Sequence, residues 1–180
     1  MNDRKGFTLV ELMIVLVIIG IIAAFAIPNL LESQKAGNET SAEKSLRTLV
    51  DAEANFMKSD YDRDGKDFCF NLGLLQTQTD GAGKAINLIP TTLASGSKEG
   101  FTYGVLATYD SAGGTNPQWG FAYYAVPTIY ASTGRRTYIV NHTGSIYYKD
   151  TGNNSTVTSS STWAGIAPET TANNWILLGE

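Results

Sequence analysis

Residues 6–31 read GFTLVELMIVLVIIGIIAAFAIPNLL, and this stretch decides the architecture of the N-terminal part of the chain. The run from Leu12 to Leu31 contains no charged residue, and Glu11 stands alone at its head. At a rise of ~1.5 Å per residue the run forms a helix of about 30 Å, which matches the hydrocarbon thickness of a bilayer. The sequence therefore predicts a membrane-spanning helix that begins with an isolated carboxylate.

An ordinary secretory signal peptide is the simplest alternative for this stretch, and three features oppose it. The apolar run is longer than a usual signal h-region, and no A-x-A site follows it before Glu32-Ser33-Gln34-Lys35. The charged leader is also separated from the apolar run by Gly6-Phe7, as if the chain were cut before the hydrophobic segment.

The motif Gly6-Phe7-Thr8-Leu9-Val10-Glu11, followed by a full apolar span, resembles the class III leader of type IV pilins and type II secretion pseudopilins. The resemblance covers about the first 57 residues, and Gly20 and Pro28 match the glycine and proline of the family's first helix. It implies that a prepilin peptidase cleaves after Gly6 and methylates the new N-terminal residue, Phe7. It also implies that Phe7, Glu11 and Pro28 act in filament assembly.

Composition sets the orientation and excludes some partners. The chain has 180 residues and a net charge of −4, and its leader cations are Arg4 and Lys5. Because cations favour the cytoplasmic side of a membrane segment, we expect a cytoplasmic N-terminus with the bulk of the chain outside. The acidic balance without a basic block argues against nucleic acid as a partner, except as an extracellular ligand of a filament.

Residues 32–58 predict an amphipathic continuation of the same helix, interrupted or bent at Pro28 because proline removes a backbone hydrogen bond. Apolar residues recur at spacings of three and four, and most charged residues fall between them. The apolar positions are Ala42, Leu46, Leu49, Val50, Phe56 and Met57, and the charged ones are Glu39, Glu43, Lys44, Arg47 and Asp51. This half of the helix therefore has one face for a globular head.

The rest of the chain predicts a β-rich head. Aromatic and β-branched residues concentrate in residues 101–109, 121–126, 136–141 and 145–149, with a shorter edge candidate at 175–178. His142-Thr143-Gly144 gives a tight hairpin between two of these runs. The expected fold is α+β, a long helix packed on an antiparallel sheet. Its parts are a leader (1–6), a transmembrane or filament-core helix (7–31), an amphipathic continuation (32–58) and a globular head (59–180).

A second resemblance concerns this head and implies no activity. It is similar to an uncharacterised head on some other proteins with prepilin-type leaders. The residues that carry it are Phe101-Thr102-Tyr103, Tyr124-Ala125-Val126-Pro127, residues 134–141 and Gly144.

Asp60, Asp62 and Asp64, followed by Gly65, form a candidate calcium site directly after the long helix. Alternating carboxylates converge on one point, and the glycine allows the sharp turn of an EF-hand loop. The second half of the pattern is missing, because Asn71 holds the place of the bidentate glutamate and Phe68 the ninth position. Asp67, the backbone carbonyl of Lys66 or water would complete the shell. The alternative is a turn that only ends the helix.

The single cysteine, Cys69, excludes an internal disulfide and lies between two phenylalanines, which favours a small buried thiol. No Ser/His/Asp set, phosphate loop or Cys/His zinc spacing is present. We therefore expect no enzyme activity and no cofactor other than calcium.

The sequence favours a structural subunit of an envelope filament, a type IV pilus or a type II secretion pseudopilus. Its partners would be further copies in a helical filament, the peptidase and an inner-membrane assembly platform. Open head-to-tail contacts that do not close generate such polymers. The alternative is a minor, tip-located subunit that binds a surface, DNA or secreted cargo. A singly anchored enzyme is the weakest hypothesis, since it gives the cleavable leader no role.

Overall fold

The computed structural model describes residues 6–59, 68–69, 71–77, 79, 86–108, 121–153, 163–164, 167–168 and 175–179. The chain forms two compact units, Met1–Gln34 and Lys35–Glu180, which are considered separately below. The predicted boundaries of the leader, the two helix segments and the head remain predictions.

One helix, α1, runs from Leu9 to Ser59 and has 51 residues. The helix continues through Gly20 and Pro28, so the predicted single helix is confirmed. Whether Pro28 also bends or loosens it stays a prediction. Two short helices follow, α2 (Leu74–Thr77) and α3 (Thr91–Ala94), and the sequence pattern did not predict either of them.

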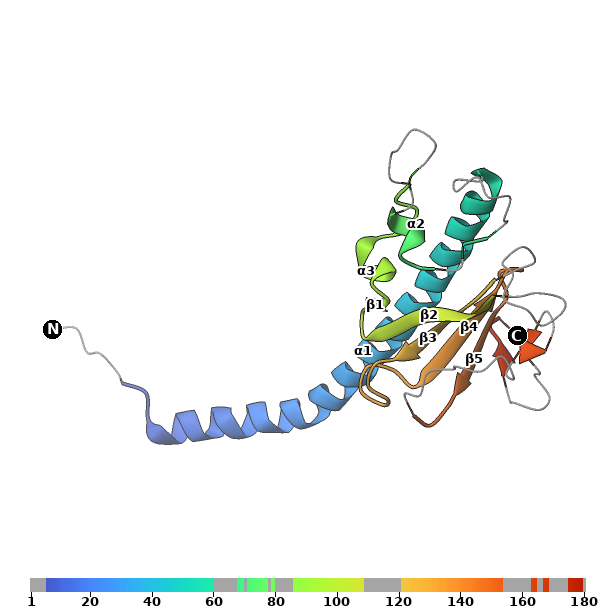
Figure 1. Ribbon diagram of the computed structural model, residues 1–180. Coiled ribbons are helices and arrows are strands. Elements are labelled where there is room, and N and C mark those ends of the chain that lie inside the picture. Colours follow the sequence, from blue (N-terminus) through green and yellow to red (C-terminus); the bar gives the residue numbers. More distant parts are fainter. Residues whose placement is uncertain are drawn as a thin grey trace. The chain divides into compact units, whose positions relative to one another are not determined.

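An antiparallel sheet of six strands forms the centre of the second unit. Its strands stand in the order β1-β2-β3-β4-β5-β8. They are β1 (Ser97–Lys98), β2 (Phe101–Thr108), β3 (Phe121–Pro127), β4 (Arg136–Asn141), β5 (Ile146–Asp150) and β8 (Ile176–Leu177). A separate pair, β6 (Trp163–Ala164) with β7 (Ala167–Pro168), is antiparallel too. Figure 1 shows the second half of α1 running across one face of β2–β5.

The predicted α+β fold is therefore confirmed, and the five predicted strand regions each contain a strand. The range 136–141 is matched to the residue, and the other predicted ranges differ from the strands by one residue at one or both ends. Strand β1 and the β6–β7 pair, whose strands have two residues each, were not predicted from the sequence.

Both faces of the sheet are covered, which explains why β3 reads FAYYAVP rather than alternating between apolar and polar residues. One face packs on the second half of α1 in a core that includes Leu46, Leu49, Phe56, Tyr123 and Tyr138. The opposite face carries a smaller cluster, whose buried members are Leu106, Ala122, Ile139, Tyr147 and Trp175.

The hairpin between β4 and β5 turns at the predicted residues. Gly144 adopts a φ of +78°, a conformation that suits glycine, and its N–H donates to the carbonyl of Asn141 at 2.9 Å. The buried Asn141 side chain also accepts hydrogen bonds from the N–H groups of Thr143 (3.2 Å) and Ser145 (3.1 Å). Asn141 thus organises the turn from inside the protein.

Candidate functional site

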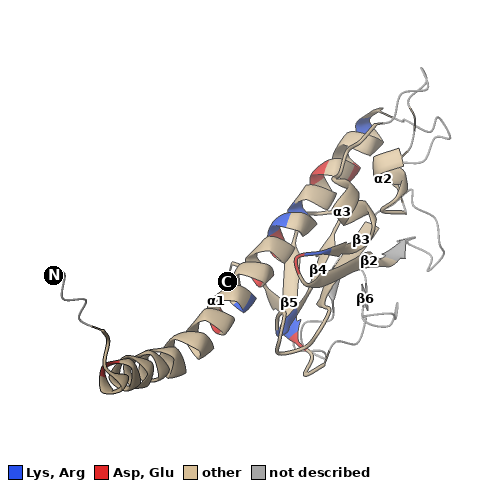
Figure 2. Ribbon diagram, turned by 90° about the vertical axis from the view of Figure 1, so that its left-hand side faces the viewer, with Lys and Arg blue, Asp and Glu red and all other residues tan. Residues whose placement is uncertain are grey.

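The most unusual surface of the molecule is the apolar segment of α1, residues 12–31. All its large apolar side chains are exposed, with exposed fractions between 47% (Val15) and 73% (Phe25). Figure 2 shows no charged position along this part of the helix. Monomeric soluble proteins rarely present a continuous apolar surface of this size. By length and composition this helix can cross a membrane, since an 18-residue window has a mean hydropathy of 3.0.

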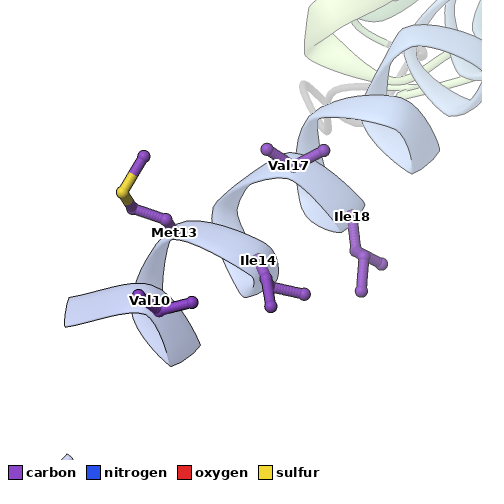
Figure 3. Close-up of a pocket in the computed structure, with 5 residues that line it drawn as sticks. All are labelled: Val10, Met13, Ile14, Val17 and Ile18. Atoms are coloured by element: carbon purple, nitrogen blue, oxygen red, sulfur yellow. The ribbon is translucent and has the colours of Figure 1, made fainter. Parts of the chain in front are cut away.

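A shallow hollow lies on this segment between Val10, Met13, Ile14, Val17 and Ile18. Figure 3 shows that all five side chains project from one stretch of one helix. The hollow has no polar lining and is lined by one stretch of one helix, so we interpret it as a helix surface rather than as a ligand pocket. Such a surface suits lipid chains or the side chains of another helix.

The helix begins with a reciprocal pair of hydrogen bonds between Thr8 and Glu11. The N–H and the hydroxyl of Thr8 each donate to Glu11 Oε2 at 2.8 Å, and the Glu11 N–H donates to Thr8 Oγ1 at 3.2 Å. This is a capping box, in which N-cap and N3 side chains satisfy each other's backbone donors. Sequence reasoning missed Thr8, although Thr8-Leu9-Val10-Glu11 fits the T-x-x-E pattern that announces such a box.

The predicted processing residues Gly6 and Phe7 lie just before this box. Phe7 is 91% exposed, and a Cβ built on Gly6 would meet no atom within 4 Å. Among the described residues, nothing covers the peptide bond between Gly6 and Phe7. Residues 1–5, which include the leader cations Arg4 and Lys5, lie outside the described residues. Cleavage after Gly6 and methylation of Phe7 therefore stay predictions.

The predicted calcium ligands Asp60, Asp62, Asp64, Lys66 and Asp67 also lie outside the described residues. Within the described part of the chain, no group of three His, Cys, Asp or Glu residues is placed to hold a metal ion. Calcium binding therefore stays a prediction. The interpretation of Cys69 as a buried thiol is confirmed, because the residue is only 3% exposed.

In the second unit, Glu39 on α1 joins the helix to the start of β4. Its Oε1 accepts hydrogen bonds from the N–H groups of Arg135 (2.8 Å) and Arg136 (3.3 Å), and its Oε2 lies 3.9 Å from the Arg136 Nε. The neighbouring Asn38 amide donates to the Thr133 carbonyl at 2.9 Å. The sequence pattern had assigned Glu39 to the polar face of the helix, and it did not show this docking role.

Glu53, farther along α1, is fully buried and was not singled out from the sequence. Its Oε2 accepts a hydrogen bond from the Cys69 N–H at 2.8 Å, and its Oε1 contacts the Tyr123 hydroxyl. Burial raises the pKa of Glu53 to about 8, although the hydrogen bonds from Tyr123 and Cys69 act in the opposite direction. Burial and the nearby Glu53 raise the pKa of Tyr123 well above its ordinary value.

Comparison with known proteins gives two family matches. The family model described as "Prokaryotic N-terminal methylation motif" matches residues 1–27. A model described as "Protein of unknown function (DUF2950)" matches residues 108–171. No solved structure matches the chain significantly.

Each of the relatives below matches less than half of the chain. The chain is 45% identical over 73 residues to the type IV major pilin protein PilA of Myxococcus xanthus, covering 40% of this chain and 32% of PilA. It is 58% identical over 50 residues to the type IV wide pilus major component PilA4 of Thermus thermophilus, covering 28% of this chain and 38% of PilA4. It is 40% identical over 52 residues to the type II secretion system core protein G of Vibrio cholerae, covering 29% of this chain and 36% of protein G.

The chain thus spans about a third of the length of these relatives. They are named as pilins and as a secretion-system core protein, and none is named as an enzyme, which agrees with the expectation from the sequence. Together with the methylation motif and the exposed apolar helix, these matches show that part of the chain is similar to type IV pilins and to a type II secretion pseudopilin.

Proposed function

We propose that this protein is a structural subunit of an envelope filament, a type IV pilus or a type II secretion pseudopilus. The precursor lies in the inner membrane with its N-terminus in the cytoplasm. It is cleaved after Gly6 by a prepilin peptidase, methylated on Phe7 and passed by an inner-membrane assembly platform into the filament. Its final location is then the cell surface or, for a pseudopilus, the periplasm.

The observation that carries this proposal is the exposure of the apolar segment, residues 12–31, in a chain whose second unit buries its own core. A bilayer covers such a helix before assembly, and helices of neighbouring subunits cover it afterwards. Because lipid and neighbouring helices are both apolar, one surface serves both states, and close helix packing supplies the contacts. The length of the segment, about 30 Å at ~1.5 Å per residue, fits the hydrocarbon core of a bilayer.

Glu11 gives the proposed assembly its axial register. Cleavage after Gly6 creates a positive amine on Phe7, and the apolar segment offers no other charge along the core. An incoming Phe7 amine that pairs with Glu11 of a subunit already at the growing end removes two unpaired charges from an apolar setting. Pro28 lies inside α1 and lacks a backbone donor, so the helix can extend there as subunits pack.

The experiment is the purification of sheared surface fibres and of periplasmic fibres from cells that carry a tagged copy in place of the native one. We expect the protein in fibres at many copies per filament, and in the inner membrane when the assembly ATPase is deleted. A few copies confined to fibre tips would favour the minor, binding subunit. Retention in the membrane in all strains, with no fibre signal, would contradict the proposal.

A further inference from the structure

Glu53, Tyr123 and Cys69 meet inside the second unit although they lie far apart in the sequence. Glu53 belongs to α1, Tyr123 to β3, and Cys69 to the segment between α1 and α2. The exposed fractions of the three residues are 0%, 0% and 3%. The Cys69 N–H donates to Glu53 Oε2 at 2.8 Å, and the Tyr123 hydroxyl contacts Glu53 Oε1 and, at 3.3 Å, the Cys69 carbonyl oxygen.

The donors and acceptors of this cluster favour one protonation state of Glu53. Tyr123 has one hydroxyl hydrogen but faces two acceptors, the Glu53 carboxyl and the Cys69 carbonyl. If Glu53 is ionised, the Tyr123 hydroxyl donates its hydrogen bond to the Glu53 carboxylate. The Cys69 carbonyl then receives no hydrogen bond from Tyr123. If Glu53 is protonated, its O–H donates to Tyr123 Oη, the Tyr123 O–H donates to the Cys69 carbonyl, and the Cys69 N–H donates to Glu53 Oε2. Each group then donates once and accepts once, and the three bonds form a closed ring.

The surrounding charges favour the same state. Among the residues that the structure describes, no lysine or arginine forms an ion pair with Glu53. Among the described residues, the titratable side chain in contact with Glu53 is the Tyr123 hydroxyl from β3. This group becomes negative when it ionises, so it does not compensate a buried carboxylate. An unpaired charge in such a place is costly, and the group neutralises instead.

We infer that Glu53 remains protonated in the folded head at neutral pH and closes a hydrogen-bond ring that joins α1, β3 and the segment after α1. The ring is a pH-sensitive clasp built into the fold. When Glu53 loses its proton, the ring opens at the Cys69 carbonyl, and a charge is left in the core. The segment after α1 then loses part of its attachment to the helix and the sheet.

The direction of the pH effect follows from the pKa of Glu53, which burial raises from 4.5 to about 8. The folded state holds one more proton than the unfolded state between these two values. The contribution of Glu53 to stability is therefore fully present below about pH 4.5 and falls as the pH rises to about 8. Above that value it no longer changes with pH.

The test compares the full chain in detergent micelles with the variant Glu53→Gln. In this variant Nε2 donates to Tyr123 Oη in place of the acid O–H, and Oε1 accepts from the Cys69 N–H, so the ring stays closed without a titrating group. We expect the melting temperature of the wild type to fall by several degrees relative to that of Glu53→Gln between pH 5 and pH 8. Two melting curves that run parallel over this range would overturn the inference.

Infrared spectroscopy in D₂O gives a direct readout that does not depend on the folding of the Glu53 variant. The carboxylic-acid C=O band of the wild type should persist at pH 7 and disappear in alkaline solution. Glu11 also lies in an apolar region, so the measurement is made in a Glu11→Gln background to remove its band. If no acid band remains at pH 7 in that background, Glu53 is ionised, and the clasp does not exist.

Discussion

The Thr8 hydroxyl donates to Glu11 Oε2 at 2.8 Å, and the Glu11 N–H donates back to Thr8 Oγ1 at 3.2 Å. Glu11 therefore has a role within its own helix besides the assembly role that we propose for it. A capping residue contributes about 0.5–2 kcal/mol to a helix, and a local loss of this size can also disturb assembly. The two roles need separate tests.

We predict that Glu11→Ala leaves a cleaved, membrane-resident protein that enters filaments poorly. The matched control is Thr8→Val, which removes one side of the capping box but keeps the Glu11 carboxylate. Filament yield is measured on sheared fibres from cells without the native copy. If the pairing with Phe7 matters, Thr8→Val assembles much better than Glu11→Ala. Equal defects would show that the capping box alone explains Glu11, and loss of cleavage in Glu11→Ala would indicate recognition by the peptidase.

Gly6 should be required for maturation, because a side chain at this position would obstruct access of the peptidase to the bond before Phe7. Intact-mass measurement of the wild type should show loss of the leader together with a gain of one methyl group. Gly6→Leu should keep the full precursor mass. Gly20→Leu is a suitable control, since a Cβ at Gly20 also meets nothing within 4 Å. Normal processing of Gly6→Leu would refute the assignment of the site.

We propose that Asp60, Asp62 and Asp64 bind calcium, with Asp67 and the Lys66 carbonyl completing the shell. Three clustered carboxylates repel one another unless a cation compensates their charge. The melting temperature of the full chain in detergent should therefore be higher with calcium than with a chelator, and Asp62→Ala should remove the difference. Asp51→Ala, which changes an exposed acid on α1, should keep it. Identical melting curves for the wild type with calcium and with chelator would contradict calcium binding and would favour the alternative, a turn that only ends the helix.

Replacement of Glu39 should weaken the docking of α1 on the start of β4. Glu39→Ala removes an acceptor from the N–H groups of Arg135 and Arg136, and a hydrogen bond to a charged group contributes about 1.5–3 kcal/mol. We expect a loss of this size in chemical unfolding of the full chain. Glu43→Ala, one turn farther along the helix, should cost less because Glu43 makes neither of these contacts. A smaller loss for Glu39→Ala than for Glu43→Ala would contradict the docking role.

Two glycines of the second unit should respond to alanine in opposite directions. A Cβ at Gly134 would lie 2.6 Å from the ring of the buried Phe101, so Gly134→Ala should destabilise the head by about 1–3 kcal/mol. A Cβ at Gly37, inside α1, would meet nothing within 4 Å, so Gly37→Ala should stabilise the helix by about 0.5–1 kcal/mol. Circular-dichroism melts of the two variants test both signs. Stabilisation by Gly134→Ala would show that the Phe101 ring can move away.

The sequence by itself determined the helix, its apolar segment and the main strands. Each depends on a local property: an uncharged run long enough for a bilayer, an apolar spacing of three and four, or a run of aromatic and β-branched residues. The hairpin at Gly144 was predictable for the same reason, because its positive φ suits glycine. The capping box of Thr8 and Glu11 was also readable, since both residues lie within one helical turn.

Only the tertiary structure decided the roles of Glu39 and Glu53. Both are glutamates on α1. Helical spacing places Glu53 on the buried face with Leu49 and Phe56, but it does not show which partners either glutamate binds. Glu39 acquires its role from the Arg135 and Arg136 N–H groups on a distant loop and strand, and Glu53 from Tyr123, which is 70 residues away in the chain. A polar side chain is buried only where partners satisfy it, and chain folding alone brings such partners together.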